Sequence, residues 1–206
     1  MSSFGKALEV WNKKVHYYLG LYFLFFLWLF SLTGLMLNHQ QWFADLYRRA
    51  EYSYDTPIAT PAGTTEVEQT RDLMRQLNLT GEIDWPASQP VGHIDFSISR
   101  PTGAAQVRVD LNAKTAYIRE FDNKPLHAFQ IFHTFSGSRF NQPASRRDWI
   151  VTSVWVWAMD ALAAGLIFTV FGSYCMWWQL KKKRALGFVV LAAGVASCAV
   201  FVTGLL

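Results

Sequence analysis

Histidine is the residue type in this chain best suited to metal or redox chemistry, because a neutral imidazole binds metal ions and haem iron. The chain has 206 residues and five histidines, at positions 16, 39, 93, 127 and 133. His39 and His133 lie beside long apolar segments, and Asp160 opens one of them. One hypothesis is a single haem b held by His39 and His133, or an iron or copper ion held by these two with Asp160. The favoured alternative is structural, with imidazoles that cap helices or bond to loop carbonyls and with Asp160 paired to Arg146 or Arg147.

The histidine positions argue against a longer electron path. A path through two haems needs two pairs of axial ligands, and each pair must come from facing elements at one depth. None of the five histidines lies inside an apolar segment. The chain also lacks HExxH, GxSxG, CxxC and phosphate-loop motifs. The sequence therefore favours a protein that is not an enzyme.

Long apolar segments are the elements that must position these residues. Only 17% of the residues are charged, against about 25% in soluble domains, which argues against a soluble globule. The basic pI of 9.1 does not indicate nucleic-acid binding, because the excess positive charge lies beside the apolar segments. Residues 17–37 and 186–206 each give a helix long enough for the roughly 30 Å of a hydrocarbon core. Residues 149–178 would reach about 45 Å, so we expect an interfacial aromatic segment over 149–158 and a span over 159–178.

Basic residues predict the orientation of these three spans. The segment 1–16 and the loop 179–185 together carry seven lysines and arginines and one glutamate, whereas residues 38–148 are close to neutral. By the positive-inside rule, 1–16 and 179–185 are cytoplasmic. Residues 38–148 and the C-terminus then face outward, into the periplasm if the membrane is a bacterial inner membrane.

The outward segment 38–148 has the pattern of a small α+β domain. Residues 38–62 are expected to form a polar exit broken by Pro57 and Pro61, and a helix is expected from Thr64 or Thr65 to Leu77. Apolar and polar residues then alternate over 94–98, 107–111 and 115–120, with short turns between them. This period of two predicts an antiparallel meander, packed on the single helix.

Several short motifs in the chain resemble those of the PepSY-associated transmembrane helix family. They are HYYLG over 16–20 with LTGLMLNH over 32–39, FHTFSG over 132–137, the span that Asp160 opens and Trp177-Trp178 closes, and VDLNAKT over 109–115, which is similar to a PepSY hairpin. The resemblance covers about residues 16–180, and it departs from the family pattern at Lys114, where a glycine is common. It implies a bacterial inner-membrane protein with a periplasmic PepSY-like domain. Larger members resemble ferric-siderophore reductases with b-type haems, so an enzymatic role here would be that of a haem-dependent iron reductase.

Small residues at intervals of four mark two of the expected spans as surfaces for helix packing. In lipid, such residues allow close approach of helices. The stripes comprise Ala161, Gly165 and Thr169 on the second span, and Ala192, Gly194, Ala196 and Cys198 on the third. We therefore expect an accessory or stabilising subunit that lies in the bilayer and contacts another membrane or periplasmic protein, in a respiratory or metal-uptake complex. The alternative function is that of a haem- or metal-binding redox protein.

Overall fold

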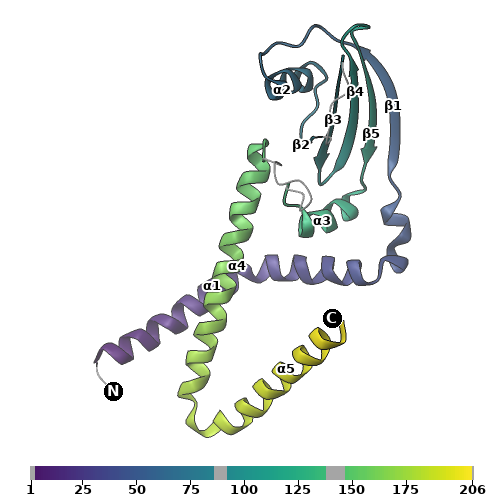
Figure 1. Ribbon diagram of the computed structural model, residues 1–206. Coiled ribbons are helices and arrows are strands. Elements are labelled where there is room, and N and C mark those ends of the chain that lie inside the picture. The colour runs from purple at the N-terminus through teal and green to yellow at the C-terminus, as the bar shows by residue number, and fades with distance from the viewer. Residues whose placement is uncertain (1–2, 86–91, 138–146, 206) are drawn as a thin grey trace. The chain divides into compact units, whose positions relative to one another are not determined.

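The computed structural model describes residues 3–85, 92–137 and 147–205. The chain divides into two compact units. Figure 1 labels its helices and strands. One unit comprises residues 28–158, and the other comprises residues 1–27 with 159–206.

Among the described residues, three helices are long and apolar enough to cross a membrane. They are α1 (Ser3–Asn38), α4 (Ile150–Gln179) and α5 (Arg184–Leu205), with the short 3₁₀ turn η2 (Lys181–Lys183) before α5. Each begins or ends outside the apolar stretch that predicts it. In α4, residues 150–158, which were expected to form a separate interfacial segment, continue the same helix, because nothing in that stretch breaks the backbone hydrogen bonding.

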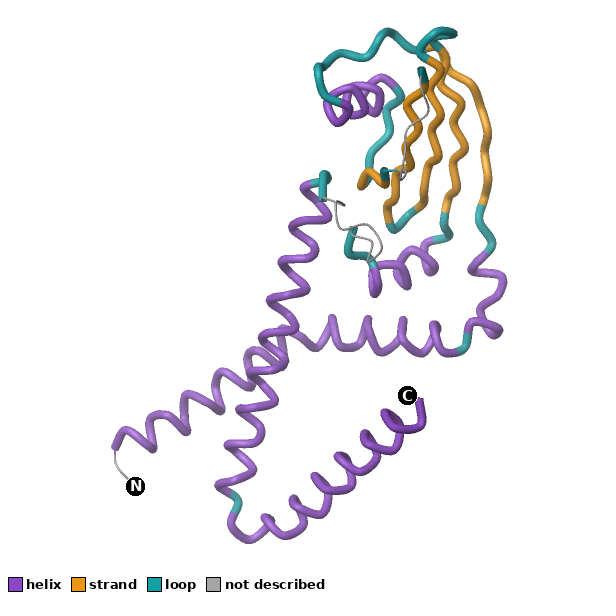
Figure 2. Tube along the Cα trace, in the orientation of Figure 1, coloured by secondary structure: helices purple, strands orange, loops and turns teal. Residues whose placement is uncertain are grey.

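A five-stranded antiparallel sheet forms the centre of unit 28–158 (Figure 2). The strand order is β1-β5-β4-β3-β2. The strands are β1 (Ala50–Pro57), β2 (Glu82–Asp84), β3 (His93–Arg100), β4 (Gly103–Asp110) and β5 (Thr115–Asp122). The central strands β3, β4 and β5 are the meander that the alternating pattern predicts, and they are joined in sequence order by tight turns.

Strand β1 corrects the expectation that residues 38–62 form only a polar exit. It pairs along its whole length with β5, from Ala50 opposite Asp122 to Pro57 opposite Thr115. Aromatic and β-branched residues favour extended backbone, and Tyr52, Tyr54 and Thr56 supply them at every second position. Pro57 is tolerated because it ends the strand at the edge of the sheet.

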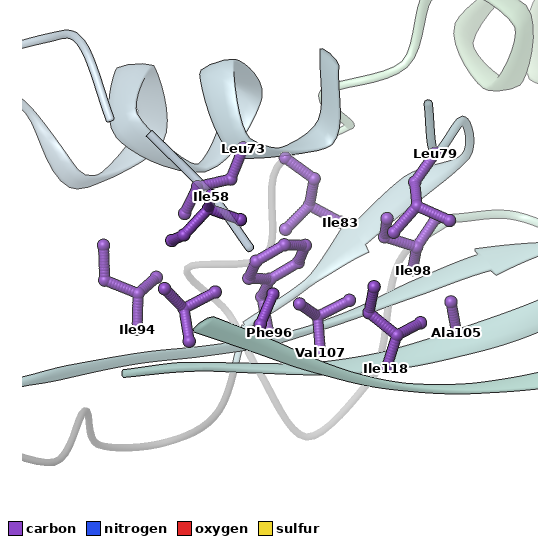
Figure 3. Packing of buried hydrophobic residues seen from close by; sticks show 12 residues of the cluster. Ile58, Leu73, Leu79, Ile83, Ile94, Phe96, Ile98, Ala105, Val107 and Ile118 are labelled. Carbon is purple, nitrogen blue, oxygen red and sulfur yellow. The ribbon is translucent and has the colours of Figure 1, made fainter. Parts of the chain in front are cut away.

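Helix α2 (Glu66–Gln76) packs on one face of the sheet and closes the apolar core (Figure 3). Its start is fixed by a capping box, in which the Thr65 side chain accepts from the Glu68 backbone and the Glu68 side chain reaches back to the cap backbone. Leu73 of α2 is fully buried. It packs in one cluster with the inward-facing residues of the sheet, among them Phe96, Ile98, Val107, Val109 and Ile118.

Two short helices lie outside the sheet in the same unit. The 3₁₀ segment η1 (Gln40–Tyr47) connects α1 to β1, and α3 (Pro125–Thr134) follows β5. Pro125 stands in the first turn of α3, where its missing N–H costs no helical hydrogen bond. Helix α3 carries His127 and His133, so it sets the positions of two of the five histidines.

Lys114 adopts the left-handed backbone conformation in the β4–β5 turn, with φ of 51°. A side chain at such a φ meets the following carbonyl, and glycine removes this strain. We therefore expect Lys114→Gly to raise the free energy of unfolding of the sheet unit by about 0.5–1 kcal/mol. This net value allows for the greater conformational freedom of glycine in the unfolded chain, which opposes the gain. Thermal unfolding in mild detergent, followed by tryptophan fluorescence, measures this effect. A melting temperature that falls would contradict it.

Candidate functional site

His133, an exposed residue of α3, contacts the C-terminal part of α1 through a hydrogen bond to a buried hydroxyl. Its Nδ1 atom lies 3.0 Å from the Oγ1 atom of Thr33, whose side chain is 1% exposed. The imidazole edge also meets the Phe30 ring, with 5.1 Å between ring centroids. The motifs LTGLMLNH and FHTFSG are therefore in direct contact, and His133 fastens α3 to α1.

The bonding of the Thr33 hydroxyl favours one tautomer of His133. Thr33 Oγ1 lies 2.9 Å from the Leu29 carbonyl and 3.2 Å from the Phe30 carbonyl, so its single proton is donated to the backbone of α1. The hydroxyl then accepts from the N–H at Nδ1 of His133. In that tautomer the Nε2 atom of His133 carries the lone pair, which is the form that binds a metal ion or haem iron.

His39, the other proposed haem ligand, has different neighbours. It follows the last residue of α1, and its ring stacks on Trp42 with 4.1 Å between centroids and a 10° interplanar angle. It lies six residues after Thr33, which corresponds to about 9 Å along a helix axis. The described residues show no contact between the His39 and His133 rings. Binding of one haem by both residues therefore stays a prediction.

The described part of the chain contains no group of three or more His, Cys, Asp or Glu side chains placed to hold a metal ion. Asp160 belongs to the unit of residues 1–27 and 159–206, and His39 and His133 belong to the other unit. A metal site of His39, His133 and Asp160 thus stays a prediction. Of the two arginines considered as partners of Asp160, Arg147 donates to the Ser136 carbonyl at 3.0 Å. Arg146 lies outside the described residues.

His127 is buried on α3 and packs edge-on against Tyr47, with 5.0 Å between ring centroids. Burial lowers the pKa of His127, and the positive charge of Arg49 lowers this pKa further. The neutral imidazole is therefore favoured. His127 and His133 contact different residues, in agreement with their six-residue separation on one helix.

Glu82 is a fully buried carboxylate that the sequence analysis does not single out. Its Oε1 atom accepts from the backbone N–H of Asp148, and its Oε2 atom accepts from that of Trp149 at 3.3 Å. These two residues immediately precede α4, so the carboxylate lies at the positive end of the helix dipole. Arg71 of α2 reaches the same segment and contacts Asp148 at 3.3 Å. Strand β2 and helix α2 are thus both joined to the start of α4.

Gly137, the last residue of the FHTFSG motif, packs into the corner between β2 and α4. Its φ is 64°, and a Cβ atom built there would lie 2.4 Å from Cγ2 of Thr152 and 3.3 Å from the Glu82 side chain. Thr152 is fully buried. The motif therefore has a structural role at both of its ends, with His133 on α1 and Gly137 against Glu82 and α4. Nothing in the sequence around Glu82 predicts its contact with the start of α4.

The sheet face opposite α2 is polar and hollowed. The hollow has a volume of about 900 Å³, and Asp55, Asp95, Arg108, Tyr117 and Arg119 are among the residues that line it. Charges on this face are paired across strands, with Arg108 3.5 Å from Asp95 and Arg119 2.5 Å from Glu51. Exposed cross-strand pairs of this kind are typical of the solvent face of an antiparallel sheet. The face offers a surface for a polar partner and no set of catalytic residues among those described.

Of the two small-residue stripes, the one on α4 contacts α1 within this chain. A Cβ atom at Gly165 would lie 2.3 Å from Cζ of Phe23, and the Phe23 ring is 4% exposed. One end of the same contact is held by Asn12, whose Nδ2 atom donates to the Gly172 carbonyl at 3.0 Å. The Thr169 hydroxyl donates to the Leu166 carbonyl of its own helix at 2.8 Å.

The stripe on α5 is open. Gly194 has no side-chain neighbour within 4 Å, and α5 has no buried residue. Ala192 and Ala196 are likewise exposed. Near its start, α5 contacts the preceding helix through Gly187 and Phe188 against Trp177. None of the described residues buries the rest of the α5 surface.

Gly165→Ala tests the close approach of α1 and α4. The added methyl group collides with the Phe23 ring, and overpacking of this kind costs about 1–3 kcal/mol. We expect weaker association of α1 with α4 and a lower melting temperature in mild detergent. Gly194→Ala on α5 is the matched control, because it adds the same methyl group in open space. Equal melting temperatures for the two variants would show that the Phe23 contact contributes nothing.

Comparison of the chain with known protein families, with curated proteins and with solved structures finds no match in any of the three. The PepSY resemblance of the short motifs therefore enters the function only as a proposal.

Proposed function

We propose that the chain is an integral inner-membrane accessory subunit with a PepSY-like outward domain, which binds or stabilises another membrane or periplasmic protein. The complex would be a respiratory or metal-uptake complex, as the family resemblance implies. The N-terminus and the basic loop 179–185 lie in the cytoplasm, and residues 38–148 lie in the periplasm. The bilayer is the second partner of the chain.

The observation that supports this proposal is the use of polar side chains to join separate elements within unit 28–158. His133 is bonded to Thr33 of α1, and Glu82 is bonded to the backbone at the start of α4. These contacts fix the sheet to the adjoining ends of two apolar helices. A fixed sheet with an exposed polar face and an open apolar helix α5 is suited to binding and positioning.

Purification from native membranes in mild detergent tests the accessory role. We expect one protein to co-purify with the tagged full-length chain in a fixed ratio. The variant Gly194→Leu should reduce that ratio, because it places a bulky side chain on the open stripe without an internal clash. Gly20→Leu on α1, where the glycine also has no neighbour within 4 Å, is the control. A monodisperse chain without a stoichiometric partner would contradict the proposal.

The second candidate function is that of a haem- or metal-binding redox protein, and the free Nε2 atom of His133 favours it. The Thr33 hydroxyl fixes the imidazole in the form that ligates iron. His133 with His39 would hold a haem, which would supply one-electron transfer. The hydrogen bond of His133 to Thr33 is compatible with a role as one haem ligand, whereas the His39 ring stacks on Trp42.

An absorption spectrum and a metal analysis of the gently purified protein test this alternative. A haem protein would show a Soret band that disappears in His133→Ala and in His39→Ala and persists in His93→Ala. Thr33→Val should shift the band, because it removes the acceptor at Nδ1 and frees the ring orientation. Colourless protein without bound metal would exclude this function.

A further inference from the structure

We propose that β1 pairs with β1 of a second copy of this chain, so that two sheets join edge to edge in a symmetric dimer. A dimer of this kind is compatible with either function proposed above, because it uses neither α5 nor the histidines.

The two edges of the sheet differ in a way that singles out β1. Strand β2, at one edge, has three residues, and Glu82 ties it to the start of α4. Strand β1, at the other edge, has eight residues, and within the described chain it pairs only with β5. All of its residues except Thr56 are exposed, and Figure 1 shows β1 as the outer strand. A long regular edge without lysine or a bulge is a template for a further strand.

Charges at the two ends of β1 point to its own copy as the partner. Arg49, directly before the strand, and Asp55, near its end, are exposed. Neither has a hydrogen bond or ion pair with a described residue. They are six positions apart, so they lie on one face of the extended chain. In agreement, Asp55 lines the hollow of about 900 Å³ and Arg49 lines a cavity of about 300 Å³, both on the face opposite α2.

The charges also select one register. When the two-fold axis is perpendicular to the joined sheet, the same face of each copy lies on the same side. Residues that lie directly opposite each other point to the same face, so one residue of β1 must lie opposite its own copy at the axis. An axis at Tyr52 places Arg49 of each copy opposite Asp55 of the other, which gives two ion pairs. An axis at Ser53 instead places Glu51 opposite Asp55 twice, and an axis at Glu51 places two glutamates together. An axis at Tyr54 leaves Asp55 opposite Ser53 and Glu51 opposite Pro57, which has no N–H to donate.

Anchoring in the membrane allows dimerisation through an interface as small as one strand pair. Residues 48–56 would pair over about 30 Å, and a single strand pair buries less than the roughly 800 Å² per partner of a standard stable interface. In dilute detergent the dimer is therefore weak. Chains anchored by apolar helices in one bilayer meet at a much higher effective concentration.

Cysteine cross-linking of the full-length chain in membranes tests the register. In a background with Cys175 and Cys198 replaced by serine, we expect Tyr52→Cys to give a disulfide-linked dimer on oxidation. Directly opposite residues in an antiparallel pair have Cα atoms about 4.5–5.5 Å apart, within the range that a disulfide spans. Tyr54→Cys is the matched control, because the two copies of residue 54 would lie about 14 Å apart along the strands.

A charge exchange tests the partner. With Tyr52→Cys present, Arg49→Asp or Asp55→Arg should each reduce cross-linking by about tenfold, because both symmetric pairs become repulsive. The double variant with both changes should restore it. The unsubstituted chain should be dimeric in lipid nanodiscs by native mass spectrometry. A monomer at every protein-to-lipid ratio, equal cross-linking at residues 52 and 54, or failure of the double variant to recover would each overturn the proposal.

Discussion

Glu82→Ala should detach the sheet from the start of α4 and lower the free energy of unfolding of unit 28–158 by about 2–3 kcal/mol. The substitution leaves the backbone N–H groups of Asp148 and Trp149 without their acceptor. Hydrogen bonds to a charged acceptor contribute about 1.5–3 kcal/mol each, and relief of the desolvation of a buried carboxylate offsets part of the loss. The ion pair of Arg71 with Asp148 remains, but an exposed arginine pair contributes little.

Hydrogen exchange measured by mass spectrometry distinguishes this local effect from general unfolding. In Glu82→Ala we expect faster exchange in peptides covering 147–158, together with a melting temperature lower by about 5–10 °C. Glu82→Gln retains one carbonyl oxygen, so its exchange rate and melting temperature should lie between those of Glu82→Ala and those of the unsubstituted chain. Glu66→Ala, which removes an exposed glutamate in the first turn of α2, is the control. Unchanged exchange at 147–158 in Glu82→Ala would refute the fastening role.

Gly137→Ala should destabilise the same corner by about 2–4 kcal/mol. Two costs combine at this position. The φ of 64° is unfavourable for any residue with a Cβ atom, and that atom would lie 2.4 Å from Thr152. Thr152 cannot move aside easily, because it is fully buried in the first turn of α4. We expect a lower melting temperature and faster exchange in peptides covering 147–158.

Gly92→Ala separates the backbone strain from the steric overlap of the new Cβ atom. Gly92 also has a positive φ, of 80°, but its nearest atom to a new Cβ is the Asn112 side chain at 3.6 Å. Its substitution should therefore cost only the backbone strain, about 1 kcal/mol. The difference between the two variants measures the packing of Gly137 against α4. If both variants lose the same stability, the close packing of the motif against α4 does not contribute.

Patterns that depend on local spacing were readable from the sequence. The apolar stretches predicted three long helices, because a helix that faces lipid needs about 20 apolar residues in succession. Alternation over 94–120 predicted the meander of β3, β4 and β5. A helix was expected to open at Thr64 or Thr65, and α2 does begin after Thr65, which forms a capping box with Glu68 within one turn. In each case the deciding interaction joins residues close together in the chain.

Strand β1 was not predicted from the sequence, although Tyr52, Tyr54 and Thr56 alternate with other residues there. The proline at 57 and the polar residues of 38–62 suggested a loop, and polar strands are hard to distinguish from loops by periodicity alone. Strand β1 acquires its hydrogen bonds from β5, whose paired residues lie 58 to 72 positions later in the chain. Pairing with so distant a segment overrides the weak local preference.

What the sequence by itself determined is the set of elements and their membrane-crossing potential, since both depend on side-chain polarity at fixed local intervals. Only the tertiary structure decided what the polar residues do. His133 meets Thr33 across 100 positions, and Glu82 meets the start of α4 across 66. Such pairings depend on how separate elements pack, and neither residue type nor spacing encodes them. For this reason a histidine that could bind iron and an ordinary-looking glutamate both serve as fasteners between the sheet and the helix ends.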